Sequence, residues 1–235
     1  MNPKGLVLFS HGSGSGRHSP RNKYFAEALV KDGIAILLVD LLTEEEGQAD
    51  MRAEKLECKI PGLILNKFNI KLLANRLISI TGWICQDTRT QNLIVGYFGA
   101  STGSAAAIVA AANLDNALAE RDKQQQKLER VDRQAARVAI GAIVSRSGRP
   151  DLAGLDYLKH TSVPILLILG ANDHSQVISW NKTALKVLGS VKKKLVMVPN
   201  ASHLFEEPGT LEEAARLASG WFRCYFQIMQ HTRVP

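Results

Sequence analysis

The sequence predicts a single α/β domain over residues 1–235, with a mostly parallel central sheet and helices on both faces. Six short apolar runs alternate with helical segments along the chain, and this alternation is typical of a parallel sheet that is covered on both sides. The hydrophobic content of 46% is enough for one full core at this length. No internal repeat divides the chain, so one domain is expected.

The first part of the chain predicts two strands with a helix between them. Residues 5–10, GLVLFS, are an apolar run that predicts a central strand, and a glycine-rich loop follows at 11–18. A helix begins near residue 19 and ends at Asp32–Gly33. The continuous apolar run at 34–39 predicts a strand buried on both faces of a parallel sheet. The glycine-rich loop lacks the lysine of a phosphate-binding P-loop, but its backbone N–H groups can still point at an anion.

The segment 41–69 is less regular than its neighbours. Its acidic start at 43–47 is expected to be solvated, and a short helix is expected at 49–58, ended by Pro61–Gly62. Such a segment either covers an active site or is a plain surface excursion, and the sequence favours neither. Residues 70–86 place apolar side chains every three or four residues, which predicts an amphipathic helix.

The stretch from Asn92 to Ala112 predicts the most distinctive element, a nucleophile elbow. An apolar strand leads into Gly99-Ala100-Ser101-Thr102-Gly103, and small residues that suit a buried helix follow. A strand, a G-x-S-x-G turn and a helix in this order lift the serine hydroxyl out of the sheet. The turn is so sharp that its flanking residues must lack bulk, and the two glycines meet that need.

The rest of the chain supplies three more strands and the helices that cover them. The charged, glutamine-rich segment 113–137 favours a helix and is expected to be an exposed helical insertion, either a partner surface or a decorated loop. Residues 145–151 are expected to form a loop. Strands are expected at 138–144, 163–169 and 194–198, and helices at 176–188 and 211–229.

The bulk properties exclude several classes of protein. The net charge of +7 is spread out, and no basic stripe is interleaved with aromatic residues, so no nucleic-acid partner is expected. No apolar run is long enough to span a membrane, and residues 1–5 lead directly into a strand, so neither a membrane partner nor a signal peptide is expected. The three cysteines show no C-x-x-C spacing. A cytoplasmic location is therefore expected, with no metal and no cofactor.

Three residues that are distant in sequence are candidates for a catalytic triad. A serine hydroxyl needs a base, and the base needs an orienting acid. In nucleophile-elbow proteins these partners follow the serine on loops after later strands, first the acid and then the histidine. Asp173 follows the strand that ends at Leu169, and His203 follows the strand that ends at Val198. Parallel strands bring these loops to one edge, so Ser101, Asp173 and His203 are expected to converge.

The oxyanion that forms during acyl transfer needs at least two N–H donors. The backbone N–H of Thr102 is expected to be one, and Gly12 or Ser13 of the glycine-rich loop the other. Asp151 is the main rival acid and His174 a minor rival base. His11 and His18 are expected to have structural or substrate-side roles.

Several stretches together support a resemblance to a known family. They are FSHGSGSGRHSPRN (9–22), GYFGASTGSAAA (96–107), SRSGRPDLAG (145–154), LGAND (169–173) and SHLFEEPGTLEE (202–213). They resemble the dienelactone hydrolase-like branch of the α/β-hydrolases, and more closely its uncharacterised bacterial members. Some of those relatives are joined to a phosphoribosyltransferase domain, for which no sequence is found here. Dienelactone hydrolases proper use a cysteine nucleophile, so the serine at 101 does not carry over lactone chemistry. The segment 113–137 is also longer than the pattern expects.

The residues and the resemblance together predict an α/β-hydrolase fold and a serine hydrolase that acts on a small ester or related acyl substrate. The partner expected is therefore a small acyl molecule, and self-association into a homo-oligomer is left open. The alternatives are a non-catalytic binding or scaffold protein that keeps the fold, and acyl transfer to an acceptor other than water.

Overall fold

A computed structural model describes residues 3–55, 64–125 and 139–233 of the chain. Its elements, in chain order, are β1 (Gly5–Ser10), α1 (Pro20–Lys31), β2 (Ala35–Leu38), α2 (Glu44–Lys55), η1 (Asn66–Phe68), α3 (Ile70–Gln86), β3 (Ile94–Ala100), α4 (Thr102–Gln125), β4 (Ile140–Arg146), η2 (Pro150–Ala153), α5 (Leu155–His160), β5 (Ile165–Gly170), α6 (Ser175–Val187), β6 (Lys193–Val198) and α7 (Thr210–Arg233).

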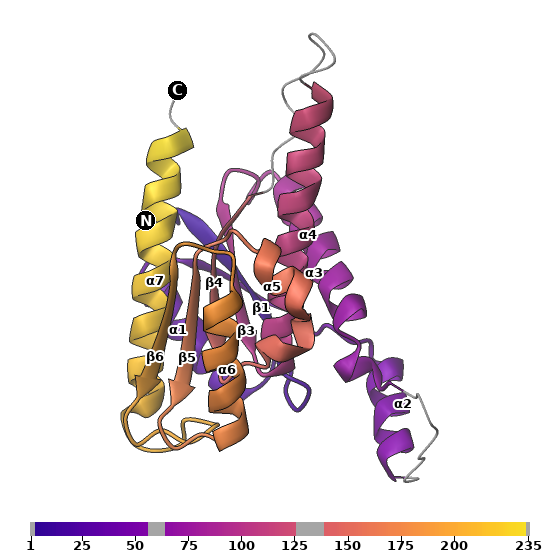
Figure 1. Cartoon of the computed structure of the whole chain (residues 1–235), viewed down its shortest axis with the longest axis vertical. Coiled ribbons are helices and arrows are strands. Elements are labelled where there is room, and N and C mark those ends of the chain that lie inside the picture. The colour runs from indigo at the N-terminus through magenta and orange to yellow at the C-terminus, as the bar shows by residue number, and fades with distance from the viewer. Residues whose placement is uncertain (1–2, 56–63, 126–138, 234–235) are drawn as a thin grey trace.

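The six strands form one sheet in the order β2-β1-β3-β4-β5-β6, and all five neighbouring pairs are parallel. The expected α/β fold is therefore confirmed (Figure 1). Because every strand runs in the same direction, all six carboxyl ends lie at one edge of the sheet. The loops after β1, β3, β4, β5 and β6 thus meet at this edge, which is where ligand sites form in open α/β sheets.

Two hydrophobic cores lie on the two faces of the sheet. On one face α1 and α7 pack through Phe25, Leu29, Phe222 and Phe226. On the other face α3, α4, α5 and α6 pack, and α4 contributes an unbroken buried run from Ala105 to Ala112. All residues of this run except Ile108 and Val109 are alanines, and these small side chains allow α4 to lie close to the centre of the sheet. None of the helices in the described part of the chain combines the length and apolar character of a membrane span.

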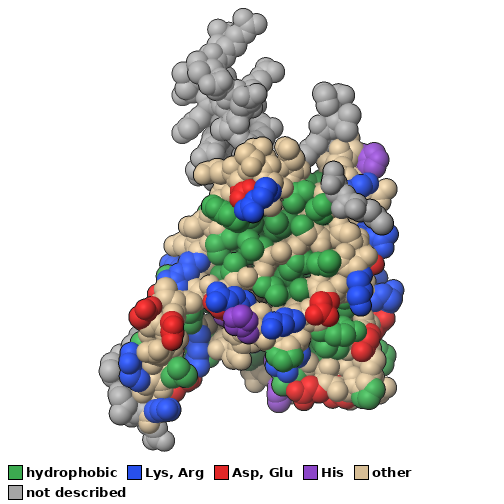
Figure 2. Space-filling view, turned by 180° about the vertical axis from the view of Figure 1, so that it is seen from behind, with side chains coloured by type: hydrophobic (Ala, Val, Ile, Leu, Met, Phe, Trp, Pro, Cys, Tyr) green, Lys and Arg blue, Asp and Glu red, His purple; other side chains and the backbone are tan. Residues whose placement is uncertain are grey.

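Strand β2 differs from its prediction, because it is not buried on both faces. It pairs with β1 alone, and all four of its residues are partly exposed. Figure 2 shows apolar side chains gathered on one face of the molecule. An apolar run indicates that a strand is hydrophobic. Whether the strand is fully buried depends on its position in the sheet, and β2 lies at the edge.

Helix α2 begins at Glu44, five residues before the expected start. A capping box explains this early start, since the backbone N–H of Glu46 donates to Thr43 Oγ1 (3.3 Å) and that of Thr43 donates to Glu46 Oε2 (2.9 Å). This reciprocal pair satisfies two N–H groups at the helix start. The acidic segment is thus the first turn of a helix, where its negative charge interacts favourably with the positive end of the helix dipole. The expected helix end, at 56–58, lies outside the described residues.

Two other segments add to the predicted pattern. The loop expected at 145–151 contains the start of η2, and the short helix α5 follows before β5. Helix α4 continues from the elbow to Gln125 without a break. The remainder of the expected insertion, residues 126–137, lies outside the described residues.

The elbow depends on close contact between the start of α4 and the end of β1. A Cβ atom added at Gly103 would lie 2.0 Å from the carbonyl oxygen of Ser10, and one added at Gly99 would lie 2.4 Å from Ser104 Cα. Backbone atoms occupy both positions, so no side chain can move aside to make room. Only glycine therefore fits at these two places.

We expect Gly103→Ala to lower the free energy of unfolding by about 3 kcal/mol, because the added methyl group must force β1 and α4 apart. Gly82→Ala is the matched control, since nothing lies within 4 Å of its added Cβ in α3. That control should gain about 1 kcal/mol from helix propensity. Urea unfolding of both variants measures the two effects. Equal stability of the two variants would show that the elbow contact is not tight.

Candidate active site

Ser101 occupies the single position between the end of β3 and the start of α4. Its φ of 48° lies in the left-handed region, which costs free energy for a residue with a Cβ atom. Backbone hydrogen bonds hold it there: its N–H donates to the carbonyl of Arg146 (3.2 Å), and its carbonyl accepts from the N–H of Arg149 (3.0 Å). The half-buried serine is thus presented at the carboxyl edge of the sheet in a backbone conformation typical of an elbow.

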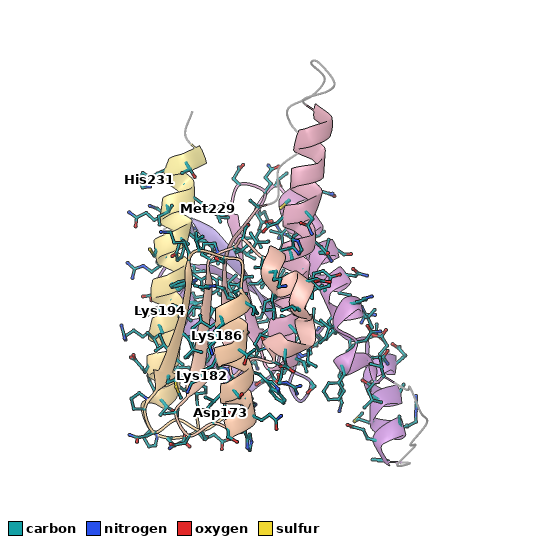
Figure 3. All side chains as sticks on the ribbon, in the orientation of Figure 1. Asp173, Lys182, Lys186, Lys194, Met229 and His231 are labelled. Atoms are coloured by element: carbon teal, nitrogen blue, oxygen red, sulfur yellow. The ribbon has the colours of Figure 1, made fainter. Side chains whose placement is uncertain are left out.

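The structure brings Asp173 and His203 together. His203 Nδ1 and Asp173 Oδ1 are 2.8 Å apart, with the aspartate side chain 0% exposed and the histidine side chain 28% exposed. Backbone bonds join their loops, since the N–H of Asn172 donates to the carbonyl of Ala201 (2.9 Å). Figure 3 shows Asp173 at the end of the molecule opposite to His231. The pair and Ser101 therefore lie at the same edge of the sheet.

Ser101 and His203 are not hydrogen-bonded to each other in the described structure. The Ser101 hydroxyl makes no hydrogen bond to any described side chain. With Nδ1 bonded to Asp173, the ring nitrogen of His203 that is left for another partner is Nε2. Two members of the expected triad are thus joined directly, and the third lies at the same edge without a bond to them.

The Asp173 carboxylate accepts three hydrogen bonds. Besides His203, they come from Ser147 Oγ to Oδ2 (2.8 Å) and from the backbone N–H of His174 to Oδ1 (2.7 Å). Burial works to raise the pKa of Asp173. The bonds from His203 and Ser147, the charge of His203 and the N–H of His174 outweigh burial and hold the pKa below the ordinary carboxyl value. Asp173 is therefore held as a carboxylate, which is the form that orients an imidazole.

The expected oxyanion donors lie beside Ser101. A Cβ atom added at Gly12 would lie 3.0 Å from Ser101 Cβ, so the glycine-rich loop packs directly against the serine. Thr102 is the first residue of α4, and N–H groups in the first turn of a helix have no partner within the helix. Gly12, Ser13 and Thr102 all line one wall of the same cavity.

This cavity has a volume of about 930 Å³ and lies between the glycine-rich loop and α2. Apolar side chains of Leu42, Met51 and Leu73 and the carboxylates of Asp40 and Glu44 also line it. Neither Ser101 nor His203 is part of its wall, so it lies beside the candidate triad. The cavity borders the candidate site at Gly12, Ser13 and Thr102, the residues expected to supply the oxyanion donors.

His11 joins the glycine-rich loop to the segment that follows β2. Its Nε2 accepts a hydrogen bond from the backbone N–H of Leu41 (3.0 Å), which leaves the proton on Nδ1, 3.0 Å from the carbonyl oxygen of Gly12. Arg17 makes a second tie, because its backbone N–H donates to Asp40 Oδ1 (2.7 Å). Both contacts join the loop to the segment that follows β2. His11 also lines the cavity, so the two roles expected for it, structural or substrate-side, both stay predictions.

The rival residues lie in other arrangements. Asp151 forms a two-point ion pair with Arg149, with its nearer contact at 2.8 Å, and the Arg149 guanidinium stacks on Trp180 (3.8 Å to the ring centre). The ring of His174 lies 5.8 Å from that of His203, measured between centres. Of the two candidate acids, Asp151 and Asp173, Asp173 is the one hydrogen-bonded to His203.

Two neighbouring residues, Arg146 and Ser147, were missed as site residues in the sequence. Ser147 bonds to Asp173, as described above. The Arg146 guanidinium is buried between Phe25 and Phe205 (5.9 and 5.8 Å to the ring centres), and its Nε and Nη1 find no hydrogen-bond partner among the described residues. Burial and the charge of Arg21 lower the pKa of Arg146 to about 10, while the charge of Asp173 opposes the shift. Both residues lie at the carboxyl end of β4. The apolar pattern of the sequence does not show where this strand ends, so it does not identify them.

Within the described ranges, no three His, Cys, Asp or Glu side chains are grouped so that they could hold a metal ion. The site consists of a serine, an imidazole, a carboxylate and backbone N–H groups. These are the components of nucleophilic acyl chemistry.

The chain is similar to known proteins over most of its length. A dienelactone hydrolase from Anabaena variabilis is 47% identical, with a TM-score of 0.76, and the match covers 95% of this chain and 87% of that one. Est1E from Butyrivibrio proteoclasticus, at 13% identity, has a TM-score of 0.66 over 97% of this chain and 90% of that one. This second likeness shows the fold alone. No family model matches the chain.

Longer relatives match as well. Two proteins from strains of Mycobacterium tuberculosis, named as candidate phosphoribosyl transferases, are 47% identical over 220 residues, which is 94% of this chain. The match covers 41% of each of those proteins, so this chain spans less than half of their length.

The lowered pKa of Asp173 makes a prediction about acid stability. A carboxyl group whose folded pKa is depressed stabilises the fold above its ordinary value of 3.8, and this contribution is lost as the pH falls toward the folded pKa. We expect the difference in free energy of unfolding between the wild type and Asp173→Asn to shrink as the pH falls below about 4. Urea unfolding from pH 6 to pH 3 measures this difference. A difference that stays constant or widens over that range would contradict the prediction.

Proposed function

Because the chain belongs to the dienelactone hydrolase-like family of the α/β-hydrolases, we propose that it is a serine hydrolase of small esters or related acyl substrates. One observation carries this proposal. Ser101 is held at an elbow with a φ of 48°, at the sheet edge where His203 is hydrogen-bonded to a buried Asp173. The reaction proposed needs no cofactor.

In the proposed first step, Ser101 Oγ attacks the acyl carbon while His203 Nε2 takes the hydroxyl proton. The tetrahedral intermediate collapses, the bond to the leaving oxygen breaks, and His203 gives its proton to that oxygen. Water then attacks the acyl-enzyme in the same way and releases the acid and the free serine. Asp173 stays ionised throughout and stabilises the imidazolium that forms in each step.

The oxyanion of each tetrahedral intermediate is proposed to lie between the backbone N–H of Thr102 and that of Gly12 or Ser13. The contact of Gly12 with Ser101 Cβ supports this placement, because a donor must lie close to the attacked carbon. Removing one such donor typically costs about 3 kcal/mol in the transition state. The two hydrogen bonds from the loop to the segment after β2, through His11 and Arg17, keep the donor in place before substrate binds.

The hydrogen bond between Ser101 and His203 is proposed to form when substrate binds, since catalytic bonds are often long in unliganded sites. The cavity beside Gly12 and Thr102 is proposed to receive one of the two substituents of the ester. Its volume of about 930 Å³ suits a small molecule. Lactone hydrolysis is not part of the proposal, because residue 101 is a serine.

We expect Ser101→Ala to reduce turnover of a short p-nitrophenyl ester by at least about 10³-fold, because the variant lacks the proposed nucleophile. A fluorophosphonate probe should label the wild type at residue 101 and should fail to label the Ser101→Ala and His203→Ala variants. Circular dichroism checks that the variants are folded. Turnover that survives in folded Ser101→Ala would remove this serine from the mechanism.

The two candidate acids are separated by a matched pair of substitutions. Asp173→Asn should lower kcat by about 10³- to 10⁴-fold, because the amide no longer holds the imidazole in the useful tautomer. Asp151→Asn should lower it by less than about tenfold, because that carboxylate pairs with Arg149 at a partly exposed site. Steady-state kinetics of both variants measures the contrast. The opposite order of effects would assign the acid to Asp151.

A further inference from the structure

The second oxygen of the Asp173 carboxylate is held by a residue outside the expected triad. Oδ1 faces His203, and Oδ2 accepts a 2.8 Å hydrogen bond from the hydroxyl of Ser147. A carboxylate bonded at one oxygen alone can rotate about its Cβ–Cγ bond. Partners on both oxygens fix its plane, and the plane decides where the His203 ring lies.

The backbone of Ser147 is strained in a way that places its hydroxyl at this point. Ser147 follows β4 directly, is 1% exposed and has a φ of 42°, in the left-handed region that disfavours residues other than glycine. Its N–H donates to the carbonyl of Ile168 in β5 (2.9 Å), which anchors the strained residue to the next strand. The hydroxyl therefore approaches Asp173 from a rigid part of the sheet.

Ser145 shows that burial in this strand does not by itself produce such a bond. It lies two residues earlier, is 0% exposed, and its hydroxyl has no hydrogen-bond partner among the described residues. The contact of Ser147 with Asp173 is thus specific to its position.

We infer that Ser147 is a positioning residue for the proposed hydrolysis: its hydroxyl holds Asp173 Oδ2 so that Oδ1 stays on Nδ1 of His203. This inference rests on the proposed function for its catalytic consequence. The hydroxyl acts through Asp173, and its contact is with the side of the carboxylate away from His203.

The inferred role has a consequence for the pH dependence of the site. The charged or titratable residues around Asp173 are His203, whose ring bonds to Oδ1, Arg146 at the end of β4, whose charge interacts with that of Asp173, and His174. His174 contacts Asp173 through its backbone N–H, and its ring centre lies 5.8 Å from that of His203. The Ser147 bond stabilises the ionised carboxylate, so its removal favours proton uptake by the Asp173–His203 pair. Since coupled groups titrate together, the pair should take up its proton at higher pH in the variant.

The test compares Ser147→Ala and Ser147→Gly with Ser145→Ala. Both Ser147 variants lose the hydroxyl. Glycine relieves the strained φ and alanine keeps it, so an effect that both variants share is caused by loss of the hydroxyl and not by a change in backbone strain. Ser145→Ala removes an equally buried hydroxyl that makes no hydrogen bond to any described residue. Two readouts are used: kcat/KM for a p-nitrophenyl ester against pH, and NMR titration of the His203 ring, identified by its loss in His203→Gln.

Both Ser147 variants should lose about tenfold in kcat/KM at neutral pH, with most of the loss in kcat, because the bond lost is to a charged group. The acidic limb of their kcat/KM profile against pH should move to higher pH, and so should the midpoint of the His203 NMR titration. Ser145→Ala should behave as the wild type in both measurements. An NMR midpoint in the Ser147 variants equal to that of the wild type would overturn the inference. The NMR readout needs no turnover. A wild type that hydrolyses no ester would therefore count against the proposed function, and the titration would still decide the role of Ser147.

Discussion

The site depends on the contact between the start of α4 and the end of β1. Gly103 lies against the carbonyl of Ser10, and Gly12 lies against Ser101 itself. These contacts leave no room for side chains, so the serine, the first turn of α4 and the glycine-rich loop form one rigid unit. The backbone N–H groups proposed to hold an oxyanion come from two sides of this unit. Their spacing is set by packing before any ligand is present, which is the condition under which such donors are most effective.

The charges at the edge are arranged around one buried carboxylate. Asp173 receives hydrogen bonds from three directions, and the cation of Arg146 is buried near it between two aromatic rings. A carboxylate that is fully shielded from water would otherwise favour its neutral form. The hydrogen bonds from His203, Ser147 and the N–H of His174, with the charge of His203, keep the charge where the imidazole needs it. The ends of β4 and β5 therefore act as one support for His203.

Much of this arrangement could be predicted from the sequence, because the signals were local. The G-x-S-x-G turn between an apolar strand and a helix of small residues identified the elbow, and the alternation of strands and helices identified the parallel sheet. Asp173 and His203 were predicted because each lies in the loop shortly after an apolar run, and the structure joins the two by a hydrogen bond. The capping box of Thr43 and Glu46 was present in the sequence, but its acidic residues were interpreted only as a solvated segment before the helix.

Other features could not be predicted, because they depend on strand order and on backbone conformation. The exposure of β2 follows from its place at the edge of the sheet, which no property of residues 34–39 reveals. The bond from Ser147 to Asp173 requires a positive φ directly after β4, and nothing in the run SRSGRPD indicates that conformation. Long-range hydrogen bonds of this kind become visible when the loops after neighbouring strands are placed side by side.

The sharp turn at Ser101 is made by its glycine neighbours and by backbone hydrogen bonds, and no part of it depends on the oxygen of the serine side chain. A thiol is close to a hydroxyl in shape, so the same turn can present sulfur without refolding. The exchange of one atom can therefore change the reactivity of the nucleophile while the scaffold stays the same. Evolution can vary the chemistry at this position independently of the architecture that supports it.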